Sequence, residues 1–125
     1  MSSYGAREQI TEAALSWEGV TAHPHRFGGT EYRLGQRELG HIHGDHMVDI
    51  PFPKKVRDDV VAAGRAQPHH LLPETGWVSF YIQEPGDVEQ AIALLRESFE
   101  LAVAQRNKRS RQPGQIITGY VYNGK

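Results

Sequence analysis

Residues 27–50 read FGGTEYRLGQRELGHIHGDHMVDI, and this stretch decides the fold. Short β-favouring runs alternate in it with Gly28-Gly29, Gly35-Gln36 and Gly44-Asp45, pairs that are typical of tight turns. Consecutive strands joined by tight turns lie antiparallel. The stretch therefore predicts an antiparallel β-meander, with strands over residues 31–34, 37–43 and 47–50.

Helices are predicted on both sides of this meander. Apolar residues at spacings of three and four predict a helix over residues 6–17, and Pro51-Phe52-Pro53 ends the meander and starts a helix at roughly residues 54–63. A loop over residues 66–75, a strand over 77–82 and a long helix from residue 87 follow. The pattern predicts an α+β domain in which an antiparallel sheet of about five strands has two helices, the first and the last, packed on one face.

The composition limits the compartment and the chemistry. The chain has 125 residues, the size of one domain, and no cysteine, which excludes disulfides, thiolate metal sites and cysteine nucleophiles. Its first residues are polar, unlike a secretory leader, and no run approaches the roughly 18–20 apolar residues of a membrane span. We expect a cytoplasmic protein that has no membrane partner.

Charge divides the chain into a body and a tail. Residues 1–105 carry nine Lys and Arg against fifteen acidic residues, a net charge of −6, whereas residues 106–125 carry five Lys and Arg and no acidic residue. We therefore predict one domain over residues 1–106 and a basic tail over 107–125. The acidic body repels nucleic acid, and only the tail has the charge to attract it.

The tail also contains a β-favouring run at residues 115–122. An unpaired edge strand is a template for another chain. This run predicts an edge strand that could join two copies in a homo-oligomer.

Histidines gather in the meander. His41 and His43 are two residues apart, so on a strand they point to the same face and could bind one metal ion. His23 and His25 repeat the spacing just before Arg26, whose guanidinium suits carboxylates and phosphates.

Two known motifs overlap these residues. Residues 41–46 spell HxHxDH, the metal signature of metallo-β-lactamases, but that fold needs a longer chain and distant ligands. Gly35 with His41 and His43 copies the start of the cupin motif, but Met47 and Val48 stand where its glutamate is expected. Two alternatives remain: a metal site of another geometry, for which no carboxylate is obviously placed, or histidines that serve as hydrogen-bonding and interface groups on a half-buried sheet face.

A further pair, His69 and His70, lies in a proline-bounded loop just before Trp77. Loops held by rigid elements concentrate ligand contacts, so the sheet face opposite the helices is predicted to form a pocket for an anionic or aromatic ligand. Trp77 either lines this pocket or belongs to the core. The predicted ligand-binding residues are His23, His25, Arg26, His41, His43, His69, His70 and Trp77, and the predicted metal ligands are His41 and His43.

Four strings carry a resemblance to a known family: HPHRFGG at residues 23–29, GHIHG at 40–44, DIPFP at 49–53 and PHHLLPETGWVSF at 68–80. In combination they resemble the small bacterial proteins of the luciferase-domain family, over residues 17–102. The order of elements also resembles the MmcQ/YjbR type, a frataxin-like two-layer sandwich. The first resemblance implies an oxygen-dependent light-emitting reaction without assigning residues or a cofactor.

The sequence thus leads to two function hypotheses. One is a small-ligand-binding or catalytic pocket lined by histidines, which titrate near neutral pH and suit proton transfer. The alternative is a protein- or nucleic-acid-interaction module of YjbR-like fold without catalysis. Catalysis, cofactor and substrate stay open, because the sequence contains neither a GxSxG elbow nor a P-loop nor a GxGxxG motif.

Overall fold

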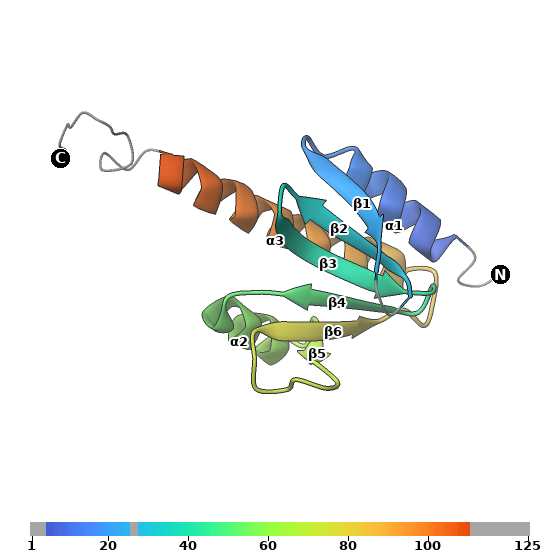
Figure 1. Ribbon diagram of the computed structural model, residues 1–125. Helices are drawn as coiled ribbons and strands as arrows, with labels where there is room; N and C mark the ends of the chain where they lie inside the picture. The colour runs from blue at the N-terminus through green and yellow to red at the C-terminus, as the bar shows by residue number, and fades with distance from the viewer. Residues whose placement is uncertain (1–4, 26–27, 111–125) are drawn as a thin grey trace, which may run out of the picture.

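The chain folds into one antiparallel sheet with helices on one face (Figure 1). The computed structural model describes residues 5–25 and 28–110. The strands are β1 (Val20–Pro24), β2 (Thr30–Leu34), β3 (Arg37–His43), β4 (Met47–Pro51), β5 (Gln67–Pro68) and β6 (Trp77–Tyr81), in the spatial order β1-β2-β3-β4-β6-β5. The helices are α1 (Ala6–Leu15), α2 (Lys54–Ala62) and α3 (Asp87–Ser110). The predicted α+β class with an antiparallel sheet is confirmed.

The predicted number of strands was too low. We expected residues 66–75 to form only a loop, but Gln67 and Pro68 pair with Ser79 and Val78 of β6. A two-residue strand is too short to give an alternating pattern, so the sequence carries no signal for it. The described sheet therefore has six strands rather than five.

The described residues form three helices, whereas only two were predicted to pack on the sheet. α1 and α3 pack on each other and on β1 to β4, and α2 contacts β6. α2 lies beside α3, because Val56 and Leu101 line one groove and Arg65, just after α2, forms an ion pair with Glu97. The helix over residues 54–62 thus covers the part of the sheet that α1 and α3 leave open.

The core fills the space between the sheet and the helices. Val48 and Ile50 of β4 and Val78 of β6 are fully buried on the helix side, against Leu95 of α3. Gly40 permits the close approach of α3, since a Cβ there would lie 2.9 Å from the Leu95 side chain. The helices thereby seal one face, and the opposite face stays available for a site.

A polar row crosses that opposite face. Directly paired residues on neighbouring strands point to the same side of a sheet. The register aligns one such set from one edge of the sheet to the other: His23, Glu31, His41, Asp49, Ser79 and Gln67. This row positions the candidate site.

Helix α3 continues beyond the predicted end of the domain. It runs through Asn107 to Ser110, and Lys108 and Arg109 lie in its last turn. The predicted edge strand at residues 115–122 lies outside the described residues, so the tail and the homo-oligomer stay predictions. Among the described residues, no helix is both long and apolar enough to cross a membrane.

A stability prediction follows from Gly76, the residue before β6. A Cβ on Gly76 would lie 1.9 Å from the carbonyl oxygen of Phe52. Gly76→Ala should therefore lower the free energy of unfolding by about 2 kcal/mol or more, measured by urea denaturation. Gly86→Ala is the matched control, since no atom lies within 4 Å of its added Cβ. Equal stability of the two variants would contradict the assigned packing.

Candidate functional site

The site is built around the carboxylate of Asp49. This side chain is only 1% exposed, and its backbone pairs with His41 of β3 on one side and Ser79 of β6 on the other. Burying an unpaired carboxylate costs several kcal/mol, so partners are obligatory. The Ser79 hydroxyl donates to Asp49 Oδ1 at 2.7 Å and fixes the orientation of the carboxylate.

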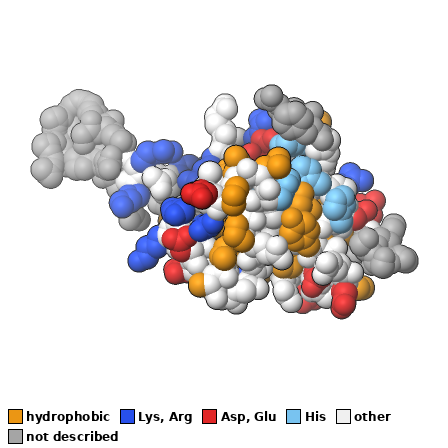
Figure 2. All heavy atoms as spheres, turned by 90° about the horizontal axis from the view of Figure 1, so that it is seen from below, with side chains coloured by type: hydrophobic (Ala, Val, Ile, Leu, Met, Phe, Trp, Pro, Cys, Tyr) orange, Lys and Arg blue, Asp and Glu red, His pale blue; other side chains and the backbone are white. Residues whose placement is uncertain are grey.

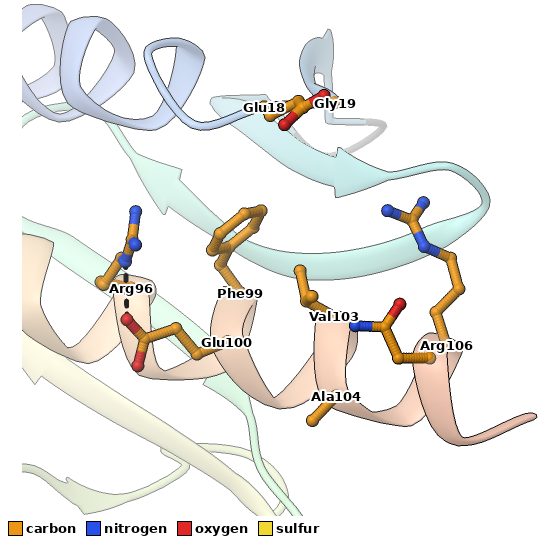
Figure 3. A pocket seen from close by; sticks show the side chains of 9 residues that line it. Glu18, Gly19, Arg96, Phe99, Glu100, Val103, Ala104 and Arg106 are labelled. Carbon is orange, nitrogen blue, oxygen red and sulfur yellow. Dashed lines mark hydrogen bonds and ion pairs between the residues drawn. The ribbon is translucent and has the colours of Figure 1, made fainter. Parts of the chain in front are cut away.

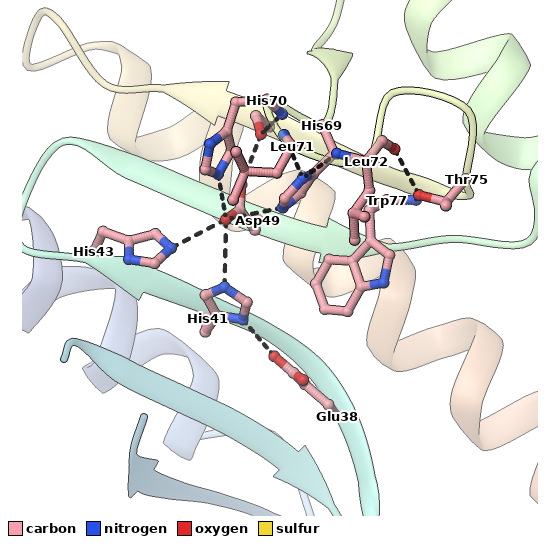
Figure 4. A network of polar contacts seen from close by, with 11 residues as sticks. Glu38, His41, His43, Asp49, His69, His70, Leu71, Leu72, Thr75 and Trp77 are labelled. Atoms are coloured by element: carbon pink, nitrogen blue, oxygen red, sulfur yellow. Dashed lines mark hydrogen bonds and ion pairs between the residues drawn. The ribbon is translucent and has the colours of Figure 1, made fainter. Parts of the chain in front are cut away.

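Four imidazoles surround the second oxygen, Asp49 Oδ2 (Figure 4). His43 Nε2 lies 3.0 Å from Oδ2, and the Nε2 atoms of His41, His69 and His70 each lie 3.3 Å from it. Two of the rings come from β3 and two from the loop before β6. The carboxylate thus joins two parts of the chain that are distant in sequence.

A β-bulge gives His41 a second carboxylate. The pairing shifts between Tyr32 and Arg33 of β2, which face Gly40 and Glu38, so β3 has one extra residue at Leu39. Residues three apart on a regular strand point to opposite faces, but the extra residue returns Glu38 to the face of His41. The distance from His41 Nδ1 to Glu38 Oε2 is 2.6 Å.

The loop before β6 is held in shape by its own hydrogen bonds. The Leu71 and Leu72 backbone N–H groups donate to His69 Nδ1 at 3.0 and 3.1 Å. Arg57 of α2 donates to the Pro73 carbonyl oxygen, and the Thr75 hydroxyl donates to the Leu72 carbonyl at 2.8 Å. These bonds hold His69 and His70 over the sheet.

These hydrogen bonds also define the proton positions on two rings. Because His69 Nδ1 accepts two N–H groups, the proton of neutral His69 is on Nε2, the atom that lies 3.3 Å from Asp49 Oδ2. In His41 the Nδ1 proton is donated to Glu38, so Nε2 is the atom that faces Asp49. His69 therefore orients the carboxylate, whereas His41 connects two carboxylates.

The pKa values of these groups depend on the balance between burial and hydrogen bonding. Burial by itself would lower the pKa of His41, but its hydrogen bonds with Asp49 and Glu38 and their negative charges outweigh burial and raise the pKa to about 9. Burial would raise the pKa of Asp49, and the hydrogen bonds with His41 and Ser79 more than reverse this and lower it. For His69, burial dominates and lowers the pKa despite the Asp49 charge.

A cleft of about 350 Å³ opens above this cluster. Its lining consists of His25, His41, His43, Asp49, His69, His70, Leu71, Leu72 and Trp77. Figure 2 shows the histidine side chains gathered in one patch beside hydrophobic ones. The volume lies at the small end of the range for ligand pockets, which is about 300–1,000 Å³.

The structure brings most of the predicted site residues to this cleft. His25 stacks on His41 with ring centroids 4.0 Å apart, and burial, followed by the nearby His41 charge, lowers the pKa of His25. Trp77 lines the cleft, with its ring 5.5 Å from that of His41. His23 lies apart, bonded through Nε2 to the Thr21 hydroxyl at 2.8 Å. Arg26 lies outside the described residues.

Sequence reasoning missed Glu38, Asp49, Ser79, Leu71 and Leu72. No carboxylate was obviously placed near the histidines in the sequence, but in the structure two carboxylates contact His41. Counting back across the 44–46 turn would have placed Asp49 opposite His41. No comparable count finds Glu38, since it depends on the bulge.

Three groups of side chains in the described part of the chain have ligand atoms close enough to hold a metal ion. They are His25–Glu38–His41, His41–His43–Asp49 and Asp49–His69–His70, and within each group the ligand atoms lie within 4.8 Å of one another. The second group contains both predicted metal ligands. All three groups share a residue with a neighbour, so the cluster is continuous.

A second hollow, of about 600 Å³, follows the C-terminal half of α3 beside Glu18 and Gly19 (Figure 3). Arg96 there donates to Glu100 at 2.8 Å, and its guanidinium lies 5.0 Å from the Phe99 ring. These charges pair along the surface and do not converge on one point. The histidine cleft is smaller, but it is the better candidate for a site.

The fold and the cleft define an α+β domain with a buried carboxylate in a histidine cluster. The chain belongs to the Luciferase domain family, which matches residues 36–98. That segment contains Glu38, His41, His43, Asp49, His69, His70, Ser79 and Trp77, whereas His25 precedes it. No curated protein and no solved structure matches the chain, so the YjbR-like pattern stays a prediction.

The pKa of His41 predicts a pH-dependent stability for the protein kept free of metal by a chelator. His41 contributes fully below its unfolded-state pKa of 6.5, and this contribution is lost as the pH rises through about 9. The stability difference between the wild type and His41→Gln should shrink by about 2–3 kcal/mol between about pH 6 and pH 9.5 in urea denaturation.

A second variant checks the cause. Glu38→Gln removes one of the two carboxylates, so the pKa of His41, followed by NMR titration, should fall below about 9. Asp49 acts at the other end of the pH range, because its lowered pKa gives stability above the unfolded value of 3.8 that is lost in acid. A His41→Gln difference that is the same at both alkaline and neutral pH would refute the assignment.

Proposed function

We propose that the chain binds a small, largely apolar molecule in the histidine cleft and holds a polar group of that molecule against the Asp49 cluster. The observation that carries this proposal is the asymmetry of the cleft. Its rim contains Leu71, Leu72 and Trp77, and its floor contains the buried carboxylate and its imidazoles. A mostly apolar pocket with a few converging polar groups is the usual form of a small-molecule site.

The exposure of the rim supports this. Leu71 and Leu72 are 74% and 47% exposed, although the hydrogen bonds to His69 and the Thr75 hydroxyl hold their loop in place. An ordered loop that presents two leucines beside a cleft leaves apolar surface for a ligand to cover. Covering one leucine contributes about 1.5 kcal/mol or more, so the rim favours an apolar partner.

The Luciferase domain match supports a second candidate, an oxygen-dependent reaction of the bound molecule. The specific observation is that the matched residues 36–98 include Asp49, the four histidines that contact it, and the two leucines of the rim. Oxygen uptake and light emission, measured with a molecule already found to bind, would test it. An unchanged oxygen concentration and unaltered molecule would leave binding as the function.

The binding proposal is tested by the fluorescence of Trp77. The chain has two tryptophans, and Trp17 packs against Phe99 away from the cleft, so Trp17→Phe leaves Trp77 as the reporter. Titration with a series of phenols and indoles, chosen as small aromatic probes, should change this fluorescence and saturate. The change should be absent with polar compounds of similar size.

The leucine rim provides the matched control. Leu71→Ser with Leu72→Ser should weaken binding of the same probe about tenfold or more, because two covered leucines are lost. Leu15→Ser removes another exposed leucine, on α1 and outside the cleft lining, and should leave affinity unchanged. Equal effects of the two changes, or no saturable binding of any apolar probe, would overturn the proposal.

A further inference from the structure

Asp49 Oδ2 has more imidazole neighbours than a carboxylate oxygen can accept as hydrogen-bond donors. Four Nε2 atoms lie 3.0–3.3 Å from it, whereas each carboxylate oxygen offers about two lone-pair directions. These rings therefore cannot all donate a proton to this oxygen at once. A cation bound by the carboxylate and by the lone pairs of deprotonated rings would satisfy these groups.

The hydrogen bonds separate ligands from supporting residues. His69 Nδ1 accepts two backbone N–H groups, so neutral His69 has its proton on Nε2 and no lone pair on that atom to bind a cation. His41 donates its Nδ1 proton to Glu38, so Nε2 is the atom that can bind a metal ion once the ion displaces the proton held there. A metal-binding histidine with a carboxylate on its other nitrogen is the arrangement that fixes and strengthens such ligands.

His43 completes the set. Its Nε2 atom lies 3.0 Å from Asp49 Oδ2, and its side chain is 26% exposed, so the ring lies between the buried carboxylate and the cleft. Ser79 and His69 hold the carboxylate from behind.

The distances agree with metal coordination. Ligand atoms about 2.0–2.1 Å from a metal ion lie about 2.9 Å apart in an octahedron and about 3.4 Å apart in a tetrahedron. The separations of 3.3 and 3.0 Å between Asp49 Oδ2 and the Nε2 atoms of His41 and His43 fall in this interval, and the ligand atoms of these three residues all lie within 4.8 Å of one another.

We propose that His41 and His43, through Nε2, and Asp49, through Oδ2, bind one divalent first-row transition-metal ion. Imidazole with carboxylate suits Zn²⁺, Fe²⁺, Co²⁺ and Ni²⁺ rather than Mg²⁺ or Ca²⁺. The inference deepens the proposed function, because an ion on the floor of the cleft would meet the polar group of the bound molecule. The polar group of the bound molecule would then be an oxygen or nitrogen atom that offers a lone pair to the ion.

The test uses the full chain, treated with a chelator and then dialysed. Titration with Co²⁺ and Zn²⁺ by calorimetry should give one ion per chain, and bound Co²⁺ should show visible absorption. His43→Gln, which removes the most exposed ligand, should weaken binding at least tenfold, and Glu38→Gln by about 10–100-fold. Asp49→Asn should abolish it.

The controls are other histidines of the chain. His23→Gln, which lies outside the cleft lining, should leave affinity unchanged. His69→Gln should weaken binding without changing the Co²⁺ spectrum, since His69 supports the site and is not a ligand. Absence of stoichiometric binding by a folded wild type, verified by circular dichroism, or binding that survives His43→Gln, would overturn the inference.

The two proposals fail separately. If apolar probes quench Trp77 in the metal-free protein but neither ion binds, the metal site is wrong and the binding pocket stands. If Co²⁺ binds through His43 but no apolar molecule is held, the metal site stands and the proposed function is wrong.

Discussion

One buried negative charge organises the exposed face of this sheet. Asp49 occupies a strand position where its neighbours Val48 and Ile50 are core residues, so its carboxylate is fixed on the opposite face with almost no access to water. A carboxylate in that position is tolerated only when donors or a cation surround it. The hydroxyl of Ser79 and the ring of His69 meet this need on one side, and the remaining imidazoles face the cleft.

The loop before β6 connects this charge to the apolar rim. The backbone N–H groups that fix the tautomer of His69 belong to Leu71 and Leu72, the same residues that present their side chains at the cleft. The same hydrogen bonds therefore position both the polar floor and the apolar rim of the cleft. A shift of this loop would change both the donor to Asp49 and the surface available to a ligand.

The sequence predicted the fold better than the site. Turns at Gly35 and Gly44 and the alternation of residues 77–81 are local signals, and they predict the meander and the face that carries the histidines. The spacing of apolar residues is a local signal as well, and it predicts α1 and α3. β5 and the position of α2 depend on contacts with β6 and α3, which no local pattern encodes. Counting the strand register from the 44–46 turn would have placed Asp49 opposite His41. The contact between Glu38 and His41 depends on a β-bulge for which the sequence has no signal.

The contacts of Asp49 close loops of very different length during folding. β3 and β4 are joined by a tight turn, so His41, His43 and Asp49 meet through the closure of a very short loop, an event on the microsecond scale. Ser79, His69 and His70 meet Asp49 only through the pairing of β6 with β4, which requires closure of a much longer loop. Burial of the carboxylate therefore depends on that long-range pairing.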